Sequence, residues 1–128
     1  MAGDPPTYPI DEQESGQYTA TITGNDGVTA LPGGTLSTLR LTVYVVKQDG
    51  TEQIVNSRNQ QSVLNANNGT VSAGGLFTWT IQPGDTTLIE PLLLQFERHY
   101  CLLEWSWPTG NQGKGEFILV VKNLRRVS

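Results

Sequence analysis

Hydrophobic and polar residues alternate over much of the chain after residue 16, and this period of two predicts β-strands with one buried face. The three clearest runs before residue 90 cover residues 16–24, 35–47 and 71–81. Within them, the positions on the apolar face are Tyr18, Ala20 and Ile22, then Leu39, Leu41, Val43 and Val45, then Phe77, Trp79 and Ile81. Each run therefore predicts a half-buried strand.

Turn-forming residues separate these runs. The triplets NDG (25–27), PGG (32–34) and QDG (48–50) predict turns, and residues 52–57 are the expected return strand after the third of them. Two further strands are predicted near the C-terminus, over residues 99–107 and 116–124. The glycine-rich residues 108–115 between them predict a hairpin loop of about eight residues.

Two polar stretches lack the strand period. In residues 57–70 we expect a loop with a short helical turn around residues 60–64. In residues 82–91 we expect a turn of helix after Asp85, whose carboxylate can cap the free amides of residues 87 and 88. Six to eight short strands without a long helix predict an all-β sandwich.

The first fifteen residues have a different composition. They contain Pro5, Pro6 and Pro9 and four acidic residues, with few apolar side chains, so they cannot fold alone. We expect an extended acidic arm over residues 1–15, followed by a β-sandwich domain over residues 16–128. The arm is either a flexible terminus or a segment that becomes ordered against a neighbouring subunit, with Tyr8 and Ile10 as its apolar anchors.

The length of 128 residues predicts a single folding unit with one sizeable core. The net charge is −4, with an acidic front end and a basic tail end that carries Lys122, Arg125 and Arg126. Three clustered basic residues are too few for duplex DNA binding, so no nucleic-acid partner is expected. No apolar run is long enough for a membrane helix, and no secretory signal is visible. We expect a soluble protein made in the cytoplasm.

The stretch ERHYCLLEWSW, residues 97–107, collects residue types that often serve in catalysis. On one strand His99 and Cys101 share a face about 7 Å apart, whereas a catalytic pair needs a contact of about 3 Å. We therefore expect Cys101 to pack in the core and His99 to have a structural role. Glu97 and Glu104 point to opposite faces, so they cannot form a facing pair. One cysteine and one histidine cannot supply a structural zinc site or an intrachain disulfide.

No catalytic, cofactor-binding or metal-binding residue is therefore predicted, and the protein is expected not to be an enzyme. The three tryptophans leave one alternative open, a carbohydrate-binding β-sandwich module. Burial of the tryptophans is favoured by their apolar neighbours. Trp107, which precedes Pro108, is expected to be the most exposed, and it would bind sugar together with Asn111 and Gln112.

Two long segments carry a resemblance to a known group of proteins. They are SVLNANNGTVSAGGLFTWTIQPGDTTLIEP (62–91) and FERHYCLLEWSWPTGNQGKGEFILVVKNL (96–124). The asparagine-rich VLNAN, the tryptophan strand before QPGDT, the ERH, the EWSW and the final VKNL resemble small immunoglobulin-like structural proteins encoded among the virion genes of tailed bacteriophages. The resemblance covers about residues 35–126 and brings no catalytic residues with it.

This resemblance implies an immunoglobulin-like fold and a place in the virion: as a cement or decoration protein on the capsid, at the head-to-tail junction, or on the tail. The negative charge favours the outer capsid surface over the DNA-filled interior. The expected partners are the major capsid protein and further copies of the chain, with a homotrimer favoured. No cofactor is expected. The residues expected at these interfaces are Tyr8, Ile10, Asp11, Glu12, Tyr100, Leu102, Lys122, Arg125 and Arg126.

Overall fold

The structure, a computed structural model, describes residues 6–89 and 95–124. These residues form β-strands and two short 3₁₀ turns, with no longer helix among them. In chain order the elements are β1 (Thr7–Asp11), β2 (Gly16–Thr21), η1 (Gly33–Thr35), β3 (Thr38–Val46), β4 (Glu52–Ile54), β5 (Gln61–Ser62), β6 (Gly69–Val71), β7 (Leu76–Ile81), η2 (Pro83–Thr86), β8 (Phe96–Trp107) and β9 (Asn111–Lys122).

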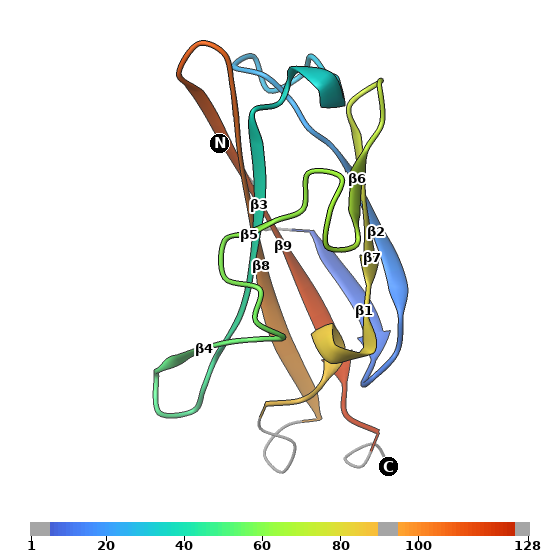
Figure 1. The fold of residues 1–128 in the computed structure, drawn as a ribbon. Coiled ribbons are helices and arrows are strands. Elements are labelled where there is room, and N and C mark those ends of the chain that lie inside the picture. Colours follow the sequence, from blue (N-terminus) through green and yellow to red (C-terminus); the bar gives the residue numbers. More distant parts are fainter. Residues whose placement is uncertain (1–5, 90–94, 125–128) are drawn as a thin grey trace.

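The strands form two sheets that face each other across one core (Figure 1). The larger sheet has the order β1-β9-β8-β3-β4, with β5 also pairing to β3. The smaller sheet has the order β2-β7-β6. The split into a β9-β8-β3-β4 layer and a β2-β7-β6 layer is that of a variable-type immunoglobulin sandwich. The predicted all-β, immunoglobulin-like fold class is confirmed.

The core lies between the two sheets and is built from the apolar faces predicted by the alternation. Leu41 of β3 and Trp79 of β7 are fully buried. Phe117 of β9 joins the layers, because its ring stacks on Tyr18 of β2 with centroids 3.7 Å apart and meets Trp79 edge-on at 5.9 Å. Aromatic side chains from both sheets therefore hold the sandwich together, mainly through the hydrophobic effect.

The hairpin of β8 and β9 differs from its predicted form. The two strands pair without a break from Phe96↔Lys122 to Trp107↔Asn111, so the turn is limited to residues 108–110. Gly113 and Gly115, two of the three glycines expected in the loop, lie in β9 instead. A Cβ atom at Gly113 would clash with the indole ring of Trp105, the residue opposite it. These glycines make room for a large side chain and do not loosen the backbone.

The two polar stretches also differ in detail from the prediction. Residues 60–64 contain no helical turn, because Gln61 and Ser62 pair with β3 as β5. A Cβ atom at Gly69 would clash with the backbone oxygen of Val63, so this loop packs tightly on β6. The 3₁₀ turn η2 ends just after Asp85 and does not begin there. The Asp85 carboxylate accepts a hydrogen bond from the backbone N–H of Gln82 at 2.8 Å, so Asp85 caps the turn from within it.

The expected arm is part of the sandwich over its described residues. Strand β1 pairs in parallel with β9, with Thr7 opposite Ile118 and Asp11 opposite Lys122. Ile10 is buried in the core of its own chain. Residues 7–11 therefore belong to the sandwich and not to an arm separate from it. Burial of Ile10 and hydrogen bonds to the edge of β9 hold them there.

Candidate functional site

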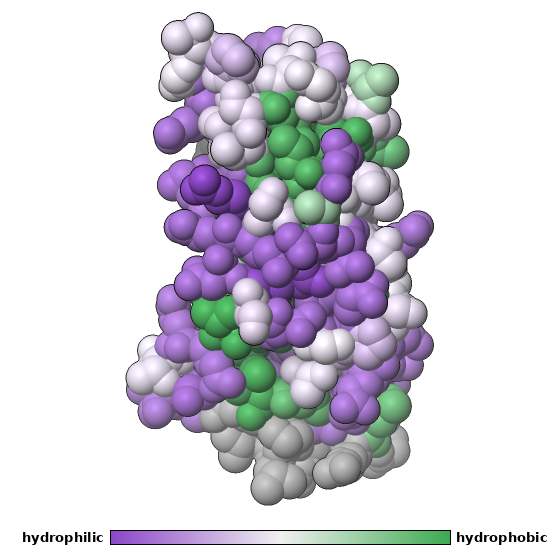
Figure 2. All heavy atoms as spheres, viewed as in Figure 1, coloured by the Kyte–Doolittle hydropathy of each residue, from purple (hydrophilic) through white to green (hydrophobic). Residues whose placement is uncertain are grey.

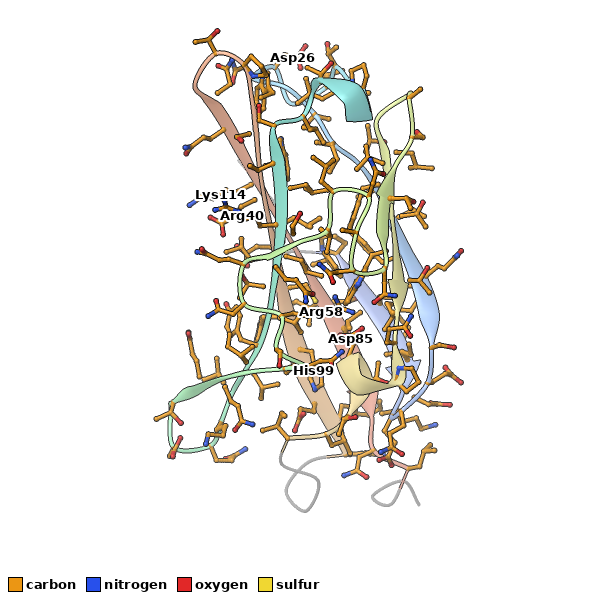
Figure 3. All side chains as sticks on the ribbon, viewed as in Figure 1. Asp26, Arg40, Arg58, Asp85, His99 and Lys114 are labelled. Carbon is orange, nitrogen blue, oxygen red and sulfur yellow. The ribbon has the colours of Figure 1, made fainter. Side chains whose placement is uncertain are left out.

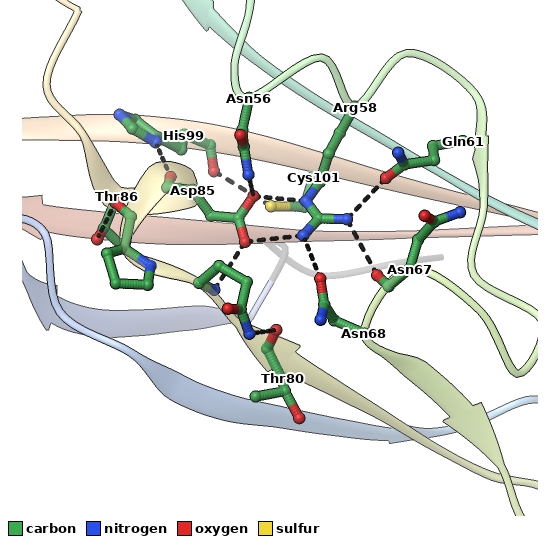
Figure 4. A network of polar contacts seen from close by, with 12 residues as sticks. Asn56, Arg58, Gln61, Asn67, Asn68, Thr80, Asp85, Thr86, His99 and Cys101 are labelled. Carbon is green, nitrogen blue, oxygen red and sulfur yellow. Dashed lines mark hydrogen bonds and ion pairs between the residues drawn. The ribbon is translucent and has the colours of Figure 1, made fainter.

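A buried polar cluster lies between the sheets beside η2, with Arg58, Asp85 and His99 at its centre (Figures 3 and 4). Glu97, also buried, belongs to it through a contact with His99. The Arg58 guanidinium donates from Nε to one carboxylate oxygen of Asp85 at 2.5 Å and from Nη2 to the other at 3.1 Å. Its remaining N–H groups reach the side chains of Gln61 and Asn68 and the carbonyl oxygen of Asn67. All five donors of this arginine are therefore satisfied.

Asp85 is equally well matched. Besides the two bonds from Arg58, its carboxylate accepts hydrogen bonds from the Asn56 amide group at 3.0 Å and the Gln82 backbone N–H at 2.8 Å. The guanidinium also lies over the ring of Trp79, 5.2 Å from its centroid. A bidentate pair with complete hydrogen bonding can remain charged inside the core, so Arg58 and Asp85 tie the loop after β4 to η2.

His99 and Glu97 continue the cluster along β8. His99 Nδ1 lies 2.8 Å from the carbonyl oxygen of Asp85, and since a carbonyl oxygen only accepts, Nδ1 carries the hydrogen. His99 Nε2 lies 2.6 Å from a carboxylate oxygen of Glu97, which also accepts the Ile89 backbone N–H at 2.7 Å. Both ring nitrogens are used in holding residues 85–89 against β8, as expected of a structural histidine.

Cys101 is buried on the same face of β8. Its Sγ lies 3.6 Å from the backbone carbonyl oxygen of His99, so this hydrogen bond is made to the backbone of His99 and not to its imidazole ring. Burial, and after it the negative charge of Asp85, raises the pKa of the Cys101 thiol well above its usual range. A thiol in this environment is a poor nucleophile, in agreement with the predicted packing role.

The reactive side chains of the cluster are closed off from solvent. Glu97, His99 and Cys101 are each at most 3% exposed. Glu104 lies on the opposite face of β8, where Lys114 approaches its carboxylate to 3.9 Å. Among residues 6–89 and 95–124, no group of histidine, cysteine and acidic side chains is placed to hold a metal ion. The accessible candidate for function is therefore a surface.

The outer face of the six-stranded sheet, the side turned away from β2, β6 and β7, carries that surface. Tyr44 of β3 and Tyr100 of β8 stand opposite each other and stack with ring centroids 5.4 Å apart. Leu102 lies next to Tyr100 on this face, half-buried. At the same end of the sheet Val46 and Phe96 are 47% and 46% exposed. Both line an open groove with Gln95, Arg98 and Tyr100.

The other half of the outer face is polar. A second shallow groove there includes Thr38, Arg40, Ser106 and Lys114. Figure 3 shows Arg40 and Lys114 outside the sheet, away from the interior where Arg58, Asp85 and His99 lie. In the register of the strands they flank Glu104, which is opposite both of them. On the adjoining side of the molecule, where β4 and β5 lie, a hydrophilic band separates hydrophobic patches above and below it (Figure 2).

The expected interface residues do not lie on one common surface. Tyr100 and Leu102 lie on the outer face, and Asp11 and Lys122 extend that face to the β1–β9 edge. Tyr8 and Ile10 point inward and pack against the core, so they are engaged within their own chain. The Glu12 carboxylate accepts the backbone N–H of Leu124 at 2.9 Å. Arg125 and Arg126 lie outside the described residues.

Sequence reasoning did not find two parts of this arrangement. The strand period of β3 already turns Tyr44 away from the core, but its stacking with Tyr100 depends on the register of β3 against β8, which the sequence does not show. The Arg58–Asp85 pair had no signal in the sequence, because Arg58 lies in a segment with no strand period and is nonetheless 3% exposed.

The tryptophans do not form a platform for sugar. Trp79 is fully buried, and Trp105 donates from its indole nitrogen to the Thr23 carbonyl oxygen at 3.1 Å. Trp107 is also buried, which differs from its expected exposure, because it packs on the core face and pairs with Asn111 across the tight turn. A carbohydrate site would need an aromatic ring open to solvent at this position.

Comparison with known proteins gives no family for this chain. In the part that the structure describes, no helix has the length and hydrophobicity needed to cross a lipid bilayer. No protein-family model matches the sequence, and no curated protein matches it.

Proposed function

We propose that this protein is a structural component of a bacteriophage virion, a cement or decoration protein that binds the outside of the capsid and stabilises it. Binding would use the outer face of the six-stranded sheet, without any chemical step. The proposal combines the sequence resemblance to phage virion proteins with one structural observation, the open apolar half of this outer face. A homotrimer at capsid threefold positions is the assembly we favour.

The apolar half of the outer face is the observation that supports binding to a protein. Tyr44, Tyr100 and Leu102 lie on a broad sheet surface, flanked by the exposed side chains of Val46 and Phe96. Clustered aromatic and aliphatic side chains on an open surface are typical of protein interfaces. The polar groove with Arg40 and Lys114 beside them would form the hydrated rim.

The charge supports an outer location in the particle. The chain has a net charge of −4, and a negatively charged protein is disfavoured next to packaged DNA. A head-to-tail connector or a tail component is the alternative within the same particle. Copy number separates the two, since a decoration protein covers the capsid lattice whereas a connector forms one ring at a single vertex.

The test compares how tightly two variants bind to undecorated capsids, where both variants introduce an aspartate but on different faces of the molecule. Leu102→Asp places a charge in the apolar half of the outer face and is expected to weaken binding at least about tenfold. Thr19→Asp places the same charge on the exposed side of β2, on the smaller sheet, and is the control. Both variants should melt as the parent does. Equal binding by both variants would refute the role of the outer face, and an electron cryo-microscopy map without copies on the capsid would refute the decoration role.

A further inference from the structure

Strand β1 is attached to the rest of the fold in a way that allows it to be exchanged between molecules. It is the edge strand of the larger sheet and pairs there with β9, whereas the next strand, β2, belongs to the other sheet. The connection between them is residues 12–15. We propose that β1 of one copy pairs with β9 of a second copy, so that copies of this chain are joined by exchanged N-terminal strands.

The contacts of β1 are specific enough to select its own sequence. The Ile118 N–H donates to the Pro6 carbonyl oxygen at 2.9 Å, and the Glu12 N–H donates to the Lys122 carbonyl oxygen at 3.0 Å, so the pairing runs along the whole strand. Ile10 is 6% exposed and fills a place in the core. These contacts connect β1 to β9 and the core, so a β1 strand from a second copy would reproduce them unchanged.

The free edge of β1 explains why a partner strand would replace β1 and not pair beside it. Pro6 and Glu12, both even-numbered, form backbone hydrogen bonds to β9. Because successive residues of a strand direct their N–H and C=O groups to opposite sides, those of the odd-numbered residues of β1 point away from β9. Pro9 is therefore placed where its missing N–H faces the open edge. A proline at this position prevents another strand from adding to the sheet. Strand exchange remains the way for a second copy to use this edge.

The connection between β1 and β2 is the hinge. Gln13 has a φ of 56°, in the left-handed region that side chains other than glycine rarely adopt. The bend also contains a hydrogen bond from the Glu14 N–H to the Asp11 carbonyl oxygen at 3.3 Å. The bend is also held to η2, since the Gln13 N–H donates to the Thr86 carbonyl oxygen at 3.2 Å and the Thr86 hydroxyl donates to the Glu14 carbonyl oxygen at 3.0 Å. An exchanged chain would give up the long bond between Glu14 and Asp11 and extend the hinge, which relieves the strain at Gln13. A short strained hinge favours exchange.

Charge also matches at this edge. Two acidic residues after Ile10 lie beside the end of β9, with Asp11 opposite Lys122 and the Glu12 carboxylate accepting a hydrogen bond from the Leu124 N–H. Lys122 and the Leu124 N–H of one copy are equally available to Asp11 and Glu12 of a second copy. An acidic arm bound to a neighbouring copy would then be held mainly through strand pairing.

The experiment mixes two single-cysteine chains in a Cys101→Ala background. One chain carries Ile10→Cys with an affinity tag, and the other carries Val121→Cys. These two positions are opposite each other in the β1–β9 pairing and face inward, so a contact between intact outer faces cannot join them. After refolding together and oxidation, exchange predicts a disulfide-linked heterodimer that increases with protein concentration.

Two comparisons complete the test. The double variant Ile10→Cys/Val121→Cys shows whether the disulfide can form; an intrachain bond in it, together with no heterodimer in the mixture, would overturn the proposal. In the otherwise unmodified chain, Gln13→Gly removes the strain of the closed bend and is expected to lower the exchanged fraction about fivefold by sedimentation analysis. Ser15→Gly in the same connection is the control, and equal effects of the two variants would also count against exchange.

Discussion

The buried pair of Arg58 and Asp85 leads to a sharp prediction about stability. Replacing Asp85 with asparagine keeps the shape but removes the charge and exchanges one acceptor oxygen for an NH₂ group. The carboxylate accepts four hydrogen bonds, two from Arg58 and one each from Asn56 and Gln82. Whichever way the new amide turns, its NH₂ group faces donors, and the guanidinium loses its counter-charge at a site that is 3% exposed.

The expected cost follows from that geometry. Breaking a buried ion pair by removing one partner typically destabilises a protein by about 3–5 kcal/mol, because the other charge remains in the core without compensation. At this chain length we expect the melting temperature to fall by roughly 10–20 °C. Urea unfolding followed by tryptophan fluorescence is the measurement, since the ring of Trp79 lies against the Arg58 guanidinium. Glu116→Gln removes the same charge at an exposed position of β9 and should leave the midpoint nearly unchanged.

A double-mutant cycle isolates the pairing itself. In the Arg58→Met background the guanidinium is gone, so Asp85→Asn should cost much less than it does in the parent chain. The reasoning is refuted if Asp85→Asn lowers the free energy of unfolding by less than about 1 kcal/mol in the parent. Equal costs of Asp85→Asn in the two backgrounds would refute it as well.

Three further outcomes can be measured on the isolated protein. Gly69→Ala should destabilise the fold by about 1–3 kcal/mol in urea unfolding because its Cβ meets a backbone oxygen, whereas Gly34→Ala, with open space around it, should have little effect. The Cys101 thiol should resist alkylation at pH 8 in the native state and react fully in denaturant, because burial raises its pKa. The pKa of Asp26 is lowered to about 2, first by the Thr29 side-chain hydrogen bond. Its turn should therefore keep its hydrogen bonds above the ordinary carboxyl pKa and lose them as pH falls towards 2, which a carboxyl NMR titration would follow; an ordinary midpoint would contradict this.

Several features of the fold could be predicted because they depend on neighbouring residues. The burial of Leu41 and Phe77 follows from a side-chain period of two, and Cys101 and His99 were correctly placed on the inner face of β8 in the same way. The same rule places Tyr100 and Leu102 on the other face. None of these inferences requires knowledge of which strands are adjacent.

Other features needed the pairing of distant segments. Glycine at position 113 suggested a loop, but its neighbour across the hairpin is Trp105, and the need for space there keeps the residue in a strand. Residues 7–11 looked unable to bury enough surface, and alone they cannot; the edge of β9, more than a hundred positions later in the chain, supplies the missing partner.

The sequence by itself determined the class of the fold and the face on which most core side chains lie, because alternation is a local property of each strand. The tertiary structure alone decided which charges meet inside the core and which apolar residues meet on the outer face. Arg58 and Asp85 are 27 positions apart, and Tyr44 and Tyr100 lie on different strands. Their contacts depend on strand order and register, which are set by the packing of the whole sandwich.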